Sequence, residues 1–82
     1  MSNALKAFKE IKRFYDSLAE AGAPIEMELY GVRDAMKRRH LTKAKDTDKA
    51  VEFLRNNNII TLDWEGPLAW IRPGQQWGVW ET

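Results

Sequence analysis

The sequence predicts a small α+β domain, in which three helices are followed by a β-hairpin with two or three strands. Two observations favour this class. Apolar residues recur at spacings of three and four through residues 5–57, which is the period of amphipathic helices. From residue 60 onward they alternate with polar residues, which is the period of half-buried strands. A chain of 82 residues has the size of one domain.

The first helix is expected over residues 5–21. Its apolar positions form one face, and the charged residues, Glu10 among them, occupy the other. Gly22 suits a left-handed cap and Pro24 cannot continue the helix, so the helix should end there. Ile25 offers one residue of strand character. The predicted apolar face consists of Leu5, Phe8, Ile11, Phe14, Tyr15, Leu18 and Ala19.

Two more helical patterns follow. In the second helix Leu29, Val32 and Met36 share a face that His40 would extend, and the basic residues at its end suit a helix C-terminus. The third helix should run from about Lys45 to Asn57. The asparagines at 56–58 are a natural stop, because asparagine tolerates the left-handed conformation that closes many helices. Its buried face is expected to hold Thr47, Ala50, Val51 and Leu54, and its outer stripe Lys45, Lys49, Glu52 and Asn56.

The hairpin is expected between residues 60 and 73. Ile60, Leu62 and Trp64 alternate with polar residues, the segment 65–67 (Glu-Gly-Pro) supplies a turn, and the alternation resumes at Leu68. The segment Arg-Pro-Gly at 72–74 ends the hairpin. The last eight residues, from Gln75, would add a short third strand or lie across the core.

Composition limits the functional classes. A hydrophobic fraction of 44%, with 11% aromatic residues, indicates a packed domain in place of a disordered chain. The chain has no cysteine, which excludes disulfides and thiolate metal sites. No apolar run approaches the ~18 residues of a membrane span, so we expect a cytoplasmic protein without a membrane partner. Residues 1–4 (Met-Ser-Asn-Ala) resemble an expression remnant, and residues 5–82 form the expected domain.

Charge is unevenly distributed along the chain. The formal net charge is only +1, yet residues 33–49 carry seven basic and three acidic groups, while both flanking segments are negative. Such a basic segment indicates an anionic partner. The alternative is a solvated charged connection beside a helix start, and the sequence leaves it open.

The order of helices and hairpin resembles that of the winged helix-turn-helix superfamily over residues 5–73. The resemblance is carried mainly by DTDKAVEFLRNNNIITLDWEGPLAWIRP, which is similar to the third helix and the wing of that superfamily. Two departures stand out. The connection from Arg39 to about Ala44 is longer than the ~3 to 4 residues of a tight helix-turn-helix, and Asn58 replaces the usual glycine.

The resemblance implies double-stranded DNA as the partner, with the third helix in the major groove. Lys45, Lys49 and Asn56 would then face base edges, since lysine suits guanine and asparagine suits adenine. Backbone phosphates would be held by basic residues at the end of the second helix and after it, without reading sequence. These residues are Lys37, Arg38, Arg39 and Lys43.

Some residues oppose this interpretation. Asp46 and Asp48 are expected to cap the third helix, and their carboxylates would repel phosphates. The wing tip holds Asp63 and Glu65, while Arg72 lies near the base of the hairpin, so we expect no DNA contact from the wing.

Four tryptophans lie in the last nineteen residues, at 64, 70, 77 and 80. Tryptophan buries a large area and is enriched at interfaces, so the segment forms either an aromatic cover on the core or a partner surface. Trp77 and Trp80 are the candidates for binding a second copy or another protein. Base stacking on the rings is disfavoured because their surroundings are acidic or neutral.

Catalysis is not expected. The chain has a single histidine, His40, and lacks a glycine-rich phosphate loop or a nucleophile elbow. His40 is expected at a helix end on the margin of the core, and one histidine cannot form a metal site. The sequence thus predicts a small DNA-binding protein without a cofactor, a transcriptional regulator or a replication accessory factor. A protein-interaction module using the tryptophan-rich segment is the alternative.

Overall fold

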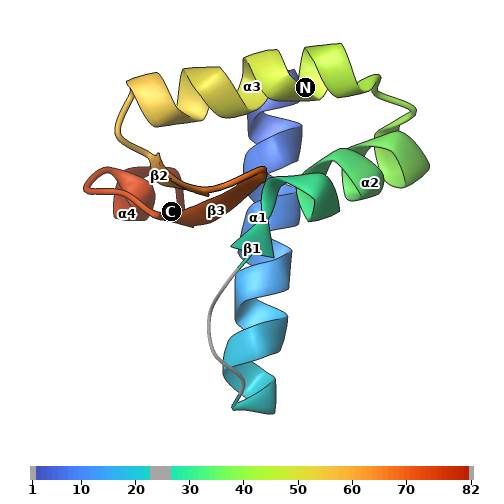
Figure 1. Cartoon of the computed structure of the whole chain (residues 1–82). Helices are drawn as coiled ribbons and strands as arrows, with labels where there is room; N and C mark the ends of the chain where they lie inside the picture. Colours follow the sequence, from blue (N-terminus) through green and yellow to red (C-terminus); the bar gives the residue numbers. More distant parts are fainter. Residues whose placement is uncertain (1, 23–26, 82) are drawn as a thin grey trace.

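The computed structural model describes residues 2–22 and 27–81, which form four helices and a three-stranded antiparallel sheet (Figure 1). The predicted α+β class is confirmed, and the elements β1 and α4 are additional to it. In chain order the elements are α1 (Asn3–Ala21), β1 (Met27–Glu28), α2 (Leu29–His40), α3 (Ala44–Asn56), β2 (Ile60–Glu65), β3 (Leu68–Pro73) and α4 (Trp77–Glu81).

Helix α1 ends as its sequence predicts, because Gly22 takes the left-handed conformation with φ 68°. Pro24 and Ile25 lie outside the described residues. Three expectations for the faces of α1 are wrong. Ala19, expected on the apolar face, is exposed. Phe14 is 42% exposed, since the lower half of α1 extends past the sheet (Figure 1). Glu10, expected on the polar face, is buried where α1 meets the end of α2.

The sheet has the strand order β1-β3-β2. Strands β2 and β3 form the predicted hairpin, with Gly66 and Pro67 between them and Gly66 at φ 61°. The third strand comes from Met27 and Glu28, which pair with β3. Of the two alternatives for the last eight residues, the third strand is wrong and the placement against the core is confirmed. Residues from Trp77 form α4, whose tryptophans pack against the core.

The connection between α2 and α3 contains only three residues, 41–43, so the expected long connection is also wrong. The backbone N–H of Leu41 donates to Lys37 at 3.1 Å, and that of Thr42 donates to Met36 at 3.1 Å. The first of these bonds, with Leu41 in the left-handed conformation, is that of an αL cap, and it closes the end of α2. The chain consequently turns at once and starts α3 within the length of a tight helix-turn-helix.

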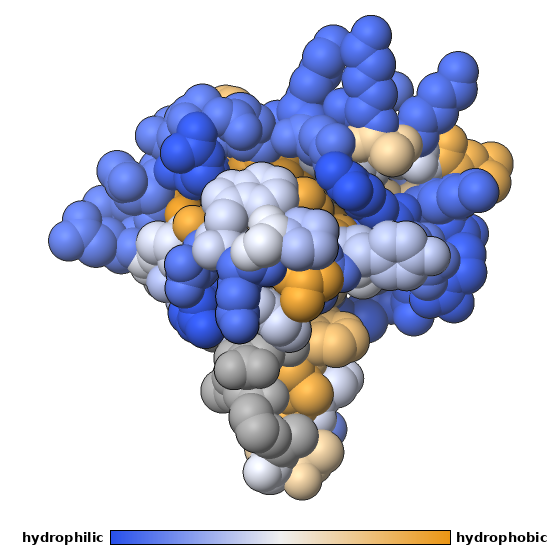
Figure 2. Space-filling view, viewed as in Figure 1, coloured by the Kyte–Doolittle hydropathy of each residue, from blue (hydrophilic) through white to orange (hydrophobic). Residues whose placement is uncertain are grey.

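Helix α3 runs along one edge of the molecule, and hydrophilic side chains cover that edge (Figures 1 and 2). Its end follows the prediction, since Asn58 adopts the left-handed conformation with φ 59°. The backbone N–H of Ile59 then donates to Leu54 at 2.9 Å, and the chain enters β2.

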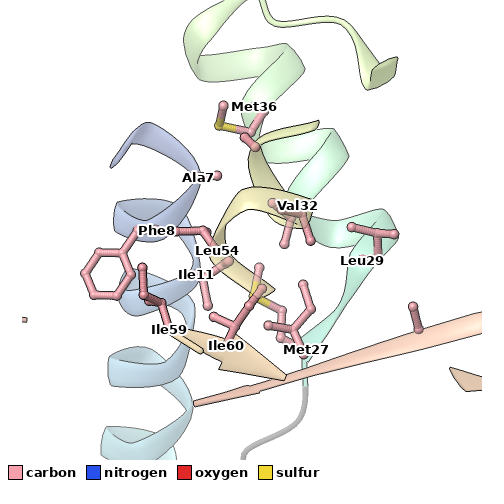
Figure 3. Close-up of a cluster of buried hydrophobic side chains, with 14 of the residues drawn as sticks. Ala7, Phe8, Ile11, Met27, Leu29, Val32, Met36, Leu54, Ile59 and Ile60 are labelled. Atoms are coloured by element: carbon pink, nitrogen blue, oxygen red, sulfur yellow. The ribbon is translucent and has the colours of Figure 1, made fainter. Parts of the chain in front are cut away.

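The core lies where α1, α2 and α3 meet the inner face of the sheet (Figure 3). Each element contributes apolar side chains that are at most a few per cent exposed. Trp77 and Trp80 of α4 pack on its margin. The core includes Phe8, Ile11, Met27, Val32, Met36, Val51, Leu54, Ile59, Ile60 and Ile71.

Candidate nucleic-acid interface

The outer face of α3 is exposed, as its spacing predicts. Lys45, Lys49 and Asn56 all lie on this face together with Glu52. The buried side of the helix matches the expectation as well, and holds Thr47, Ala50, Val51 and Leu54. Since the apolar side is anchored in the core, the stripe of lysine and asparagine must point into solvent.

The turn before α3 adds two more lysines. Lys37 at the end of α2 and Lys43 at the start of α3 line one surface hollow of about 440 Å³, together with Leu41, Thr42 and Ala44. No described residue forms an ion pair with any of the four lysines of this region. We call this set the free lysines: Lys37, Lys43, Lys45 and Lys49.

Arg38 and Arg39 behave differently from the free lysines. The Nε of Arg38 lies 2.9 Å from a carboxylate oxygen of Asp34, and the Nε of Arg39 lies 3.4 Å from one of Glu10. Both arginines line the hollow between α1 and α2 with Arg13. The structure therefore divides the predicted phosphate-binding group, because two of its members already have carboxylate partners.

Asp48 does not cap α3, contrary to the expectation. The N-cap residue is Lys43, and its side chain makes no capping hydrogen bond. Arg33 donates from Nε to Asp48 at 2.7 Å and from its terminal nitrogen at 2.9 Å. The side-chain hydrogen bond to Asp48 raises the pKa of Arg33 above its ordinary value. Asp46 remains in the first turn of α3, exposed and without an ion pair among the described residues.

A buried carboxylate links α1 to the end of α2. Glu10 is only 5% exposed, and its oxygens lie 3.0 Å from Nε2 of His40 and 3.4 Å from Nε of Arg39. A buried carboxylate is costly unless it is paired and hydrogen-bonded, and these two contacts provide the pairing. His40 lies at the core margin, as predicted. Sequence spacing alone could not find this contact, because Glu10 falls among surface residues of α1.

Leu41 is the least expected residue of the region. It takes the left-handed conformation with φ 54° and is 89% exposed. Glycine or asparagine normally occupies such a position, since the left-handed region costs another residue about 1 kcal/mol. The sequence gives no signal for this placement, because a leucine after a helix is ordinarily expected in the core.

The tryptophans of the C-terminal segment lie in an aromatic cluster. The ring centroid of Trp77 lies 4.7 Å from that of Phe8 and 5.7 Å from that of Tyr15. Trp80 lies 5.5 Å from Phe8 and 6.2 Å from Phe53. Both tryptophans are partly buried, so each presents only part of its surface to a partner.

The tip of the hairpin carries the exposed tryptophan. Trp64 is 62% exposed, and Leu68 beside the turn is also exposed. Arg72, the one cation of the hairpin, is bound to Asp63 at 3.1 Å. The side chain of Glu65 has no ion pair among the described residues, which leaves the tip acidic and apolar.

Comparisons of the chain with protein-family models, curated proteins and solved structures found no match. Within residues 2–22 and 27–81, no cluster of three histidine, cysteine, aspartate or glutamate side chains is placed to hold a metal ion. In the same ranges no helix combines the length and the apolar character needed to cross a bilayer.

Proposed function

We propose that this chain is a small DNA-binding protein of the winged helix-turn-helix type, with α3 as the helix that enters the major groove. The observation that carries the proposal is the group of four free lysines. They come from the end of α2, the turn and the outer face of α3, and none has an ion pair among the described residues. Exposed, unpaired lysines suit phosphate oxygens, which dominate affinity for DNA.

The order of the elements supports the same type. Helix α1 is followed by a short strand, the pair α2 and α3, and a hairpin whose second strand pairs with β1. The three-residue turn between α2 and α3 is as short as in a tight helix-turn-helix. The outer side of α3 is free of other elements along the molecular edge (Figure 1).

Neighbouring carboxylates support the proposal because most of them are neutralised. Asp48 is bound by Arg33, and Glu52 by Arg55 on the same helix. Asp46 is the exception, and its charge opposes the approach of a phosphate. The free lysines outnumber this carboxylate by four to one.

The residues divide into two roles. Lys45, Lys49 and Asn56 would reach base edges, because they project from the exposed stripe of α3. Lys37 and Lys43 would hold phosphates and set the register. Arg38 and Arg39 would contribute less than the lysines, since a phosphate must compete with the carboxylates of Asp34 and Glu10.

The proposal is tested by measuring fluorescence anisotropy with a random duplex at several salt concentrations. A random duplex offers no specific base contact, so all four free lysines are expected to bind phosphates in that complex. Four phosphate contacts predict a slope of about −3.6 in a plot of log K against log salt, a loss of about 100-fold between about 50 and about 200 mM. Lys45→Ala and Lys49→Ala should each reduce the slope by about 1. Lys9→Ala is the matched control, since it removes the same charge from the exposed surface of α1.

Two results would contradict the proposal. One is an absence of binding at about 50 mM salt. The other is an equal loss of affinity in the Lys9 and Lys49 variants, which would show that binding depends on the net charge of the chain and not on the position of the lysines.

A protein-interaction function is the second candidate, and the tip of the hairpin favours it. Trp64 and Leu68 are exposed there beside the carboxylate of Glu65. A tryptophan in such a place is typical of an interface anchor. Sedimentation of the wild-type chain and of Trp64→Ala tests whether copies associate through this tip, and an unchanged monomer mass in both would exclude self-association by this route.

A further inference from the structure

We propose that Leu41 is an apolar DNA contact, which packs against a thymine methyl group or a deoxyribose while Lys37 and Lys43 hold the phosphates on either side. The inference rests on the proposed function and adds a residue of a different chemical kind to it. It starts from two unfavourable properties of this one residue, its backbone conformation and its exposure.

The first property is the backbone conformation. Leu41 has φ 54°, in the left-handed region that glycine and asparagine occupy at helix ends. The structure itself offers a comparison, since Gly22 ends α1 and Asn58 follows α3 with φ values of 68° and 59°. Residues held in disfavoured backbone conformations cluster at functional sites, so this conformation supports a hypothesis of function for Leu41.

The second property is exposure. At 89% Leu41 is the most exposed large apolar residue among those that the structure describes. It therefore adds little to the core, and its side chain is available for a partner. Exposed apolar side chains that stand alone are ordinary, so exposure acquires meaning here only together with the strained backbone and the neighbouring charges.

The neighbours indicate what that partner is. Lys37 and Lys43 line the same hollow as Leu41, and neither has an ion pair among the described residues. An apolar side chain that shares a hollow with two cations matches the surface of duplex DNA, where sugars and thymine methyl groups lie between rows of phosphates. Apolar contact with the thymine methyl is an established mode of reading DNA. A protein partner would need acidic groups around an apolar site, and it is the other outcome of the test.

The decisive variant is Leu41→Gly. Glycine adopts the left-handed conformation without steric cost, so the midpoint of thermal unfolding should stay equal to that of the wild type or rise by a few degrees. DNA affinity should fall about tenfold, because the apolar contact is lost. An apolar contact releases no counterions, so the salt slope should stay unchanged, whereas Lys43→Ala should lower it by about 1.

Two further variants serve as controls. Leu41→Met keeps an apolar side chain and should bind DNA as the wild type does. Asn58→Gly places glycine at the left-handed position beyond the other end of α3, away from the free lysines, and should leave affinity unchanged. A loss of affinity in Leu41→Gly alone would then be due to the missing leucine.

Duplexes that contain deoxyuridine in place of thymidine separate the two apolar targets. If the methyl group is the target, the wild type should lose affinity on deoxyuridine and Leu41→Gly should not distinguish the two duplexes. If deoxyribose is the target, Leu41→Gly should bind both duplexes more weakly by the same factor.

The inference and the proposed function fail in different ways. If the wild type binds DNA with the expected salt slope and Leu41→Gly binds equally tightly, Leu41 is no DNA contact and the proposed function stands. A change of oligomer mass in Leu41→Gly with unchanged DNA binding would assign the residue to a protein contact. No binding by the wild type contradicts the proposed function itself.

Discussion

The guanidinium group of Arg33 holds the carboxylate of Asp48 through two hydrogen bonds, of 2.7 and 2.9 Å, and the pair joins α2 to α3. A bidentate contact of this kind fixes geometry as well as charge. Asp48 lies near the start of α3, one residue before Lys49. The pair therefore decides whether an uncompensated carboxylate lies beside the exposed lysines of α3.

We expect Arg33→Met to weaken DNA binding and Asp48→Asn to strengthen it. Arg33→Met leaves the negative charge of Asp48 uncompensated, which repels phosphates. Asp48→Asn leaves the positive charge of Arg33 uncompensated, which attracts them. The double variant restores the balance and should bind within about twofold of the wild type, a difference of about 0.4 kcal/mol. Anisotropy titrations of the four proteins check this order, and a double variant as weak as Arg33→Met would show that the contact acts through the position of α3.

The same variants should change stability only slightly. Both side chains are more than one third exposed, so the coupling free energy in a double-mutant cycle should be below about 1 kcal/mol and should shrink with salt. Because the pKa of Arg33 is raised in the folded state, the contribution of the pair to the free energy of unfolding is present at neutral pH. It is lost only as pH rises through the pKa of Arg33. Urea unfolding at neutral and at mildly alkaline pH should therefore give the same coupling.

Glu10→Gln should destabilise the fold by about 1 to 2 kcal/mol. The carboxylate is buried and contacts Arg39 and His40, and the amide would weaken both charge-assisted contacts. The value is modest because Arg39 is half exposed and keeps its hydration. Urea unfolding measures the change, with Glu20→Gln on the exposed surface of α1 as the control. Equal midpoints for the two variants would contradict the role of Glu10.

Gly74→Ala should cost about 2 kcal/mol, since the chain after β3 passes directly over the end of α3. An added Cβ at Gly74 would touch the carbonyl oxygen of Asn58 and lie 2.9 Å from its carbonyl carbon. Backbone atoms cannot move aside as a flexible side chain can, so the new methyl forces a strained shift.

Gly78→Ala is the matched control for this change. Nothing lies within 4 Å of a Cβ at Gly78, and the residue is helical, so alanine should be neutral or stabilise by up to about 1 kcal/mol. Thermal and urea unfolding compare the two variants. A Gly74 variant as stable as the Gly78 variant would contradict the close approach.

Trp77→Ala should destabilise the domain by about 3 kcal/mol, because its ring packs against Phe8 and Tyr15 at the core margin. Trp64→Ala should cost less than about 1 kcal/mol, since Trp64 is 62% exposed. Urea unfolding separates the two tryptophans. If both variants lose the same stability, the hairpin tip supports the fold more than its exposure indicates.

The buried face and the outer stripe of α3 could be predicted from the sequence. Thr47, Val51 and Leu54 recur at helical spacing, and that periodicity is a local property of the chain. The hairpin and the left-handed stop at Asn58 were predicted for the same reason, because alternation and turn residues are read from neighbouring positions.

Strand β1 could not be predicted, because two residues carry no periodicity and Met27 becomes a strand only by pairing with Ile71. Helix α4 could not be predicted for a similar reason. Its two tryptophans were expected to pack, yet only the contact with Phe8 decides how the segment lies. In both cases a distant part of the chain provides the stabilising contact.

The candidate site shows the same division. Its lysines, Asn56 and the helix that presents them follow from residue types and their spacing, so the sequence by itself determined which groups face outward from α3. Only the tertiary structure decided which charges are available: Arg38 and Arg39 have carboxylate partners, Arg33 neutralises Asp48, and Leu41 is held exposed in a tight turn. The physical reason is that pairing and burial depend on residues that approach through space, and spacing along one helix contains no information about them.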